Sequence, residues 1–113
     1  MSFEEILNRI LQHEHVESVI FLDSEGEEIF SYGITDPQHL KLMGAYQGIV
    51  LNSIRRLKLG NNRFVVTIGR NCSIYTQQLK LGYFVCVLLS ADANFAHAQF
   101  QFQDYFNSLS AEL

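Results

Sequence analysis

The 113-residue sequence has few residues that break or cross-link a chain: one proline, seven glycines, two cysteines and no tryptophan. With 48% hydrophobic and 18% charged residues, this composition excludes a collagen-like, linker-rich or disordered protein. The length leaves no room for a second domain with its own core. We therefore expect one folded domain over residues 1–113 that is stable without disulfides or metal.

Long apolar runs are also missing. The longest, Tyr83–Leu89, is much shorter than the roughly 20 residues that a membrane-spanning helix requires. Cys72 and Cys86 form no C-x-x-C pair, and no basic and apolar leader precedes the first predicted helix. These observations predict a cytoplasmic protein with reduced thiols and no direct membrane insertion.

The middle third of the chain contains no acidic residue. Residues 1–40 carry nine acids and one base and residues 81–113 carry three acids, whereas all seven remaining bases lie between them, giving a net charge of −4. These bases are Lys41, Arg55, Arg56, Lys58, Arg63, Arg70 and Lys80. Either they share one surface, which then favours an acidic partner, or the acidic ends of the chain interleave with them and cancel the field. The acidic total and the lack of an RNA-stacking motif argue against nucleic acid.

Catalytic and cofactor-binding motifs are absent as well. No G-x-G-x-x-G, G-K-[ST] or G-x-S-x-G pattern occurs. The densest group of potential metal ligands, His13-Glu14-His15, has neither the H-E-x-x-H nor the Cys/His-finger spacing, so we interpret it as a polar connection. Cys86 is expected in the core, and Cys72, near a turn, is the candidate for redox sensitivity. The sequence therefore predicts no catalytic residue, no cofactor and no metal.

Hydrophobic periodicity predicts three helices and five strands. The first helix begins at a capping box, Ser2 with Glu5, and reaches about His13; the third carries an apolar stripe from Phe95 to Leu109. The strands are expected at Val16–Leu22, Glu27–Tyr32, Arg63–Gly69, Cys72–Leu79 and Tyr83–Leu89. The last of them lacks polar alternation and the first is nearly as apolar, so both faces of their sheet should be covered.

The second helix, about Pro37–Leu59, is apolar on two faces and contains Gly44 and Gly48 four residues apart. Such glycines permit close approach of another backbone, or they are tolerated surface positions. The element order is α-β-β-α-β-β-β-α. It predicts an α/β fold, a three-layer α/β/α sandwich around a five-stranded antiparallel sheet.

With this topology, the sequence resembles the roadblock family, which includes roadblock-type dynein light chains and bacterial gliding-motility proteins, over essentially its whole length. The resemblance lies in residues 3–7, 19–26 and 83–89 and in the following Asp92-Ala93-Asn94. It implies strand order 2-1-5-4-3, with the second helix on one face and the terminal helices on the other. It also implies a homodimer in which the strand Arg63–Gly69 pairs with its mate and the second helices pack together.

The residues themselves favour the same interface. An apolar edge strand without proline or an inward charge is an aggregation hazard unless it is paired, and a helix with two apolar faces needs a second cover. The predicted dimer interface is Gly44, Gly48, Leu51, Arg55, Phe64, Val65, Val66, Thr67 and Ile68. Candidate partner-binding residues are Lys41, Arg55, Arg56 and Lys58.

The resemblance implies a non-enzymatic regulator or scaffold for a small Ras-like GTPase. In the bacterial branch it implies that the dimer repositions the catalytic residues of the GTPase without inserting an arginine finger. Alternatives are a motor-complex light-chain adaptor or a small-molecule sensor whose pocket is lined by some of the nine Phe and five Tyr residues. The alternative to the sensor is that these aromatic residues fill the core.

Overall fold

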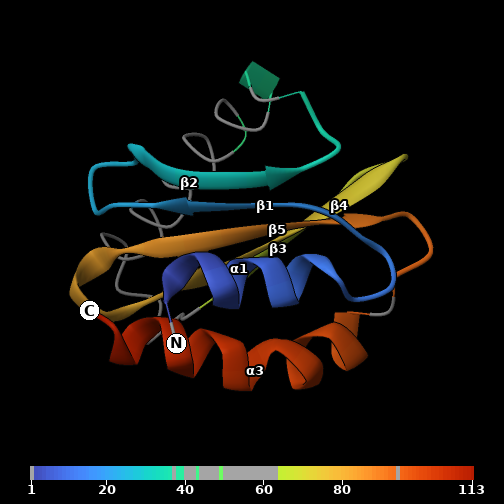
Figure 1. The fold of residues 1–113 in the computed structure, drawn as a ribbon. Coiled ribbons are helices and arrows are strands. Elements are labelled where there is room, and N and C mark those ends of the chain that lie inside the picture. The colour runs from blue at the N-terminus through green and yellow to red at the C-terminus, as the bar shows by residue number, and fades with distance from the viewer. Residues whose placement is uncertain (1, 37, 40–42, 44–48, 50–63, 94) are drawn as a thin grey trace.

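The computed structural model describes residues 2–36, 38–39, 43, 49, 64–93 and 95–113; for residues 95, 96, 98 and 99 it describes the backbone only. Figure 1 shows a sheet with two helices beneath it. All five strands are antiparallel and follow the order β2-β1-β5-β4-β3, as predicted. Their bounds are β1 Val16–Leu22, β2 Glu28–Gly33, β3 Phe64–Ile68, β4 Cys72–Gln78 and β5 Phe84–Ser90.

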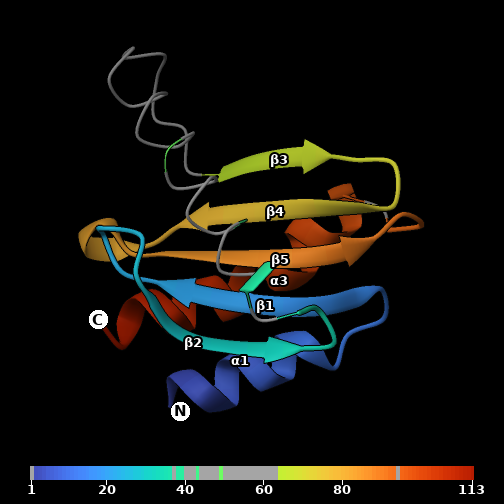
Figure 2. The same ribbon diagram turned by 90° about the horizontal axis from the view of Figure 1, so that it is seen from above.

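Two helices, α1 (Phe3–Leu11) and α3 (Phe95–Ala111), lie side by side on one face of the sheet (Figures 1 and 2). The side chain of Ser2 caps α1 by accepting a 3.2 Å hydrogen bond from the backbone N–H of Glu5, which confirms the predicted helix start. The apolar stripe of α1 enters the core, where Ile6, Leu7 and Ile10 are buried; the stripe of α3 does the same through Phe102, Phe106 and Leu109.

The second face of the sheet has its own apolar cluster. It consists of Ile20, Leu22, Ile74, Phe84, Cys86 and Leu88, all buried. Met43 packs against this cluster and, like Gln38, His39 and Ile49, is helical, in agreement with the helix predicted over Pro37–Leu59. The remaining residues of the predicted segment, with Gly44, Gly48, Leu51 and Arg55, lie outside the described part. The three-layer prediction is confirmed, because helical residues lie on both faces.

Element ends account for most of the differences from the predicted boundaries. The strand β2 ends one residue later than predicted, at Gly33, whose φ of +129° suits glycine. A Cβ at Gly33 would lie 2.4 Å from both the Glu17 carbonyl oxygen and Ser18 Oγ. Ser18 Oγ also donates to Thr35 Oγ1 at 2.6 Å, which fixes the chain as it leaves the sheet. This close approach joins distant residues, so local sequence patterns did not predict it.

Lys80–Gly82, which lies between two of the predicted strands, forms a short 3₁₀ turn between β4 and β5. The helix α1 ends at Leu11 rather than near His13, because Gln12 and His13 donate to carbonyls of the last turn and the chain then turns into β1. Within the described residues no helix is both long and apolar enough to cross a membrane.

We predict that stability falls in alkaline solution because two core groups resist ionisation. Burial raises the pKa of the Cys86 thiol to about 12, although the hydrogen bond from Thr76 opposes the shift, and burial raises the pKa of Tyr75 to about 12. In the unfolded chain the cysteine thiol ionises at about pH 8.5 and the tyrosine hydroxyl at about pH 10. The unfolded state therefore loses protons first, and the free energy of unfolding should decrease as the pH rises from about 9 to 12.

Urea unfolding at pH 7, 9 and 10.5, under reducing conditions, measures this decrease. The Cys86→Val variant should remove the part that begins near pH 9 and retain the part due to Tyr75. Wild-type stability that is constant up to pH 10.5 would contradict the prediction.

Candidate functional site

The two edges of the sheet differ in regularity. In β2 the pairing with β1 shifts between Phe21 and Leu22, so Ile29 is an extra residue and forms a bulge. Two exposed acids, Glu27 and Glu28, lie at the start of this strand. A bulge and charges are features that prevent an edge strand from pairing with another chain. The β2 edge is therefore poorly suited to β-sheet extension.

The opposite edge has neither feature. The strand β3 pairs with β4 in unbroken register from Phe64↔Gln77 to Ile68↔Ser73 and ends the described sheet. It contains no charged residue and no proline, yet Phe64 is 38% and Ile68 73% exposed. A regular, apolar edge of this kind favours pairing with another strand. The β3 edge is the best candidate for a protein–protein interface.

The structure thus locates five of the nine residues predicted for the interface. Phe64, Val65, Val66, Thr67 and Ile68 form the edge strand, as expected. The other four, Gly44, Gly48, Leu51 and Arg55, and all the partner-binding candidates, Lys41, Arg55, Arg56 and Lys58, lie outside the described residues. The interface and partner-binding roles of all these residues, including those of β3, remain predictions.

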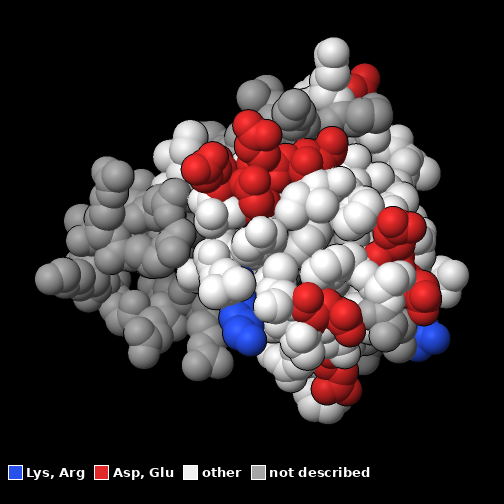
Figure 3. Space-filling view, turned by 60° about the vertical axis from the view of Figure 1, so that its left-hand side comes forward, with Lys and Arg blue, Asp and Glu red and all other residues white. Residues whose placement is uncertain are grey.

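Two of the seven bases of the middle third can be located. Arg70 is in the turn between β3 and β4, and Lys80 begins the connection from β4 to β5, so they lie at opposite ends of β4 (Figure 2). These two do not share one surface. Acidic side chains gather in patches instead (Figure 3). In the β1–β2 turn, Asp23 Oδ1 accepts hydrogen bonds of 2.9 Å from the N–H groups of Glu25 and Glu27, which fixes these acids at the surface.

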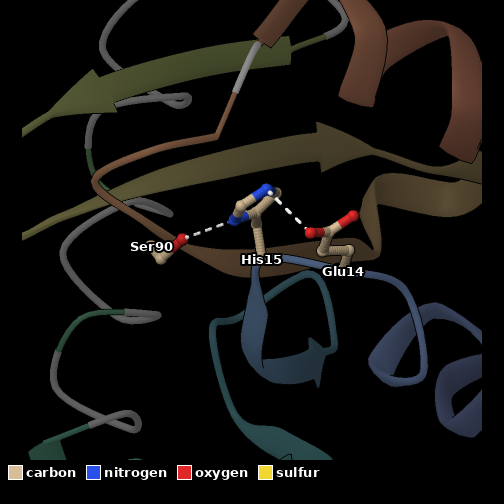
Figure 4. Close-up of polar contacts among 3 residues, drawn as sticks. All are labelled: Glu14, His15 and Ser90. Carbon is tan, nitrogen blue, oxygen red and sulfur yellow. Dashed lines mark hydrogen bonds and ion pairs between the residues drawn. The ribbon is translucent and has the colours of Figure 1, made fainter.

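A polar cluster at the start of β1 was not predicted. His15 Nδ1 lies 3.2 Å from Ser90 Oγ, and His15 Nε2 lies 3.7 Å from Glu14 Oε1 (Figure 4). His15 has a φ of +71°, in the left-handed region. The N–H of Ser90 donates to the His15 carbonyl at 2.8 Å, which extends β5 to Ser90. No sequence motif indicates this contact, because the two residues are 75 positions apart.

Serine, histidine and an acidic residue also form the catalytic triads of serine hydrolases. The arrangement here instead fits a structural contact between two strands. The side chain of Glu14 is 88% exposed and comes directly before His15 in the chain, so it holds the imidazole weakly. In addition, the N–H of Ser90 is already engaged by His15 and does not point toward a developing oxyanion. The contacts join the beginning of β1 to the end of β5.

His13 has a similar structural role between the two described helices. Its Nε2 lies 3.0 Å from the hydroxyl of Tyr105, and its Nδ1 contacts the amide nitrogen of Gln101. Its ring packs edge-on against Phe102 and Tyr105, with 5.4 Å between centroids in each case. Both ring nitrogens of His13 therefore contact other side chains of the protein. This agrees with the interpretation of His13-Glu14-His15 as a polar connection. No cluster of three metal-ligating side chains occurs in the part of the chain that the structure describes.

The aromatic residues predominantly pack against one another. Phe3 stacks on Phe21 at 5.1 Å and Phe21 lies 5.9 Å from Tyr83. A second series runs from Phe64 through Tyr75 to Phe106, with separations of 5.4 and 5.6 Å. These rings fill space between the sheet and its helices, as expected if the aromatic residues form the core rather than line a ligand pocket.

No protein-family model matches the sequence, and comparison with curated proteins finds no significant match. Solved structures with the same fold exist, however. A roadblock/LC7 domain from Streptomyces avermitilis has a TM-score of 0.85 at 18% identity and covers 99% of this chain and 98% of its own. An MglB structure with a tetrameric arrangement has a TM-score of 0.83 at 13% identity, covering 96% of this chain and 85% of its own.

The gliding protein MglB from Thermus thermophilus has a TM-score of 0.81 at 11% identity, with the same coverage of 96% and 85%. Because these structures match nearly the whole chain, the chain has the roadblock fold, which confirms the predicted architecture. At such low identities the likeness establishes the fold alone.

We predict that the Ser90–His15 contact stabilises the protein without catalysing hydrolysis. Ser90→Ala should lower the free energy of unfolding by about 0.5–1.5 kcal/mol, since one hydrogen bond is lost. Hydrolysis of p-nitrophenyl acetate should be equally slow for the wild type and Ser90→Ala after correction for spontaneous hydrolysis. A wild-type rate that exceeds the background and depends on Ser90 would identify an active site instead.

Proposed function

We propose that this roadblock-fold chain forms a homodimer through β3 and, in that form, binds a small Ras-like GTPase as a non-enzymatic regulator or scaffold. The observation that carries the proposal is the contrast between the two sheet edges: β2 is bulged and acidic, whereas β3 is regular, uncharged and apolar. An MglB structure with the same fold has a tetrameric arrangement, which supports the proposal that this fold can assemble.

Two-fold symmetry makes β3 self-complementary. In an antiparallel pair around a dyad near Val66, each Phe64 lies toward the Ile68 end of the other strand, so the same patch serves both chains. Pairing extends the five-stranded sheet across the dyad and removes exposed apolar surface from Phe64 and Ile68. The residues predicted on the second helix would complete such an interface.

The assignment of a GTPase as partner rests on the family resemblance of the sequence and on the gliding proteins among the structural neighbours. A scaffold needs no catalytic residues, which agrees with the structural roles of His13, His15 and Ser90. A regulator of this kind acts by holding the residues of the GTPase in an active arrangement, and a motor-complex adaptor would use the same assembled surface.

The first prediction from this proposal concerns mass in solution. Wild-type protein at tens of micromolar should sediment as a dimer, and Ile68→Lys should shift it toward monomer, because each new lysine would face the other chain's strand. Val66→Lys should have the same effect with a larger loss of fold stability, since Val66 is partly buried.

Ile29→Lys is the matched control. It introduces the same charge into the other edge strand, at the bulge, and should leave the dimer intact. Equal dissociation by the two variants, or a monomeric wild type, would overturn the β3 interface.

The second prediction concerns the GTPase. Titration of a cognate Ras-like GTPase in its GTP-bound state should give saturable binding to the wild type and to Ile29→Lys, and at least about tenfold weaker binding to Ile68→Lys, because a composite surface is lost with the dimer. The protein alone should not hydrolyse GTP. If the monomeric variant bound the GTPase as strongly as the wild type does, GTPase binding would not require the dimer, and that part of the proposal would be wrong.

A further inference from the structure

The helical side of β2 carries two aromatic side chains that α1 covers only in part. Phe30 and Tyr32 are two residues apart, so they share one face of the strand, and both are half-buried against the core under α1 and α3. Their ring centroids are 6.4 Å apart and the ring planes differ by 13°. Next to them, Phe3 of α1 stacks on Phe21, the residue that pairs with Phe30 in the sheet. We call Phe3, Phe30 and Tyr32, all half-buried, the β2 aromatic surface.

Acidic side chains from two elements border this surface. Burial and, to a smaller extent, the negative charge of Glu4 raise the pKa of Tyr32, so the Glu4 carboxylate is close enough to act on the tyrosine hydroxyl. Glu27 is exposed in the β1–β2 turn, three residues before Phe30. The start of α1 and this turn lie at the same end of the sheet (Figure 1), and Figure 3 shows acidic patches separated by uncharged surface. Aromatic and acidic groups therefore meet at this end.

The described bases do not neutralise these acids. Within the described residues, neither Glu4 nor Glu27 forms an ion pair. Arg9 is five positions beyond Glu4, which turns it about 140° around α1 at about 100° per residue. Lys80 lies beside α3, which accepts a hydrogen bond from its backbone N–H, and Arg70 lies in the turn between β3 and β4. Among the described residues, the negative charge beside the rings is therefore uncompensated.

We propose that the β2 aromatic surface binds an arginine side chain within a basic segment of a partner protein. The face of an aromatic ring attracts a cation, and a guanidinium is flat enough to stack on the ring while its N–H groups donate to a carboxylate. Phe30 and Tyr32 supply the rings, and Glu4 and Glu27 supply the carboxylates. The site includes no residue of β3, so it is independent of the proposed dimer and of GTPase binding.

The border of the surface selects this occupant. An apolar segment would cover the rings but would remove water from the carboxylates without giving them partners. A metal ion would satisfy the carboxylates but would leave the rings exposed. The other acids of the turn and of the start of β2, Asp23, Glu25 and Glu28, extend the negative surface beyond the reach of one side chain. A segment with an arginine and further basic residues complements both the rings and this charge.

Three labelled peptides test the site on the full-length chain. Each has about ten residues in a glycine–serine background, with several positions occupied by arginine, by lysine or by citrulline, the uncharged analogue of arginine. Fluorescence anisotropy should show saturable binding of the arginine peptide, with one peptide per chain, that weakens as salt is added. The lysine peptide should bind about threefold or more weakly, because an ammonium does not stack, and the citrulline peptide about tenfold or more weakly.

Two variants remove the ring or the charge, and each has a matched control. Phe30→Leu should weaken the arginine peptide about threefold or more and bring its affinity close to that of the lysine peptide. Phe100→Leu, the same change at an exposed phenylalanine of α3, should have less than about a twofold effect. Glu27→Gln should weaken both charged peptides about threefold or more. Glu14→Gln, at the other end of β1, should change neither affinity by more than about twofold.

Thermal unfolding checks that each variant is folded. Glu27→Gln keeps the backbone N–H that donates to Asp23, so this comparison is decisive even if Phe30→Leu does not fold. The proposal is wrong if the arginine peptide does not bind saturably, if the lysine or citrulline peptide binds as tightly, or if Glu27→Gln and Glu14→Gln have equal effects. Saturable binding of calcium chloride that displaces the peptide would assign the acids to a metal ion and would also overturn the proposal. Ile68→Lys should bind the arginine peptide like the wild type, whatever its mass in solution, which separates this site from the β3 dimer.

Discussion

The fold depends on the pairing of β1 with β5 at the centre of the sheet. Their register aligns Val19 with Val87 and Ile20 with Cys86, and every one of these residues is buried. Because neighbouring residues along a strand point to opposite faces, continuous burial requires an apolar cover on each side. The terminal helices form one cover, and the second apolar cluster, which Met43 contacts, marks the other.

Once the centre is fixed in this way, β2 and β3 are the edge strands of the described sheet, where backbone pairing with another chain can occur. The two outer strands have opposite properties: β2 has a bulge at Ile29 and acids beside it, whereas β3 is regular from Phe64 to Ile68. This contrast favours backbone pairing on the β3 side of the domain.

The sequence allowed most of the elements to be predicted because their signals are local. The Ser2 cap, the stripe of α1 and the apolar run of β5 each lie within a few consecutive residues, and each confirmed prediction follows from that locality. The strand order came from the family resemblance, since periodicity alone does not specify which strands are neighbours.

Features that depend on distant contacts were not predictable. The left-handed His15 is stabilised by Ser90, and the end of β2 at Gly33 depends on the closeness of Glu17 and Ser18. Likewise, the sequence showed that β3 is apolar but gave no sign that β2 contains a bulge, because a bulge is a property of two paired strands. The distinction between the edges therefore required the structure.

The bulge at Ile29 also determines how far the sheet can grow. If both rims accepted a strand, each added chain would offer a new rim, and head-to-tail stacking would produce fibres of unlimited length. With one rim blocked, the proposed joining of two chains would use the competent rim of each and leave the blocked rim at both outer ends. A single extra residue in β2 would thus make the proposed assembly finite.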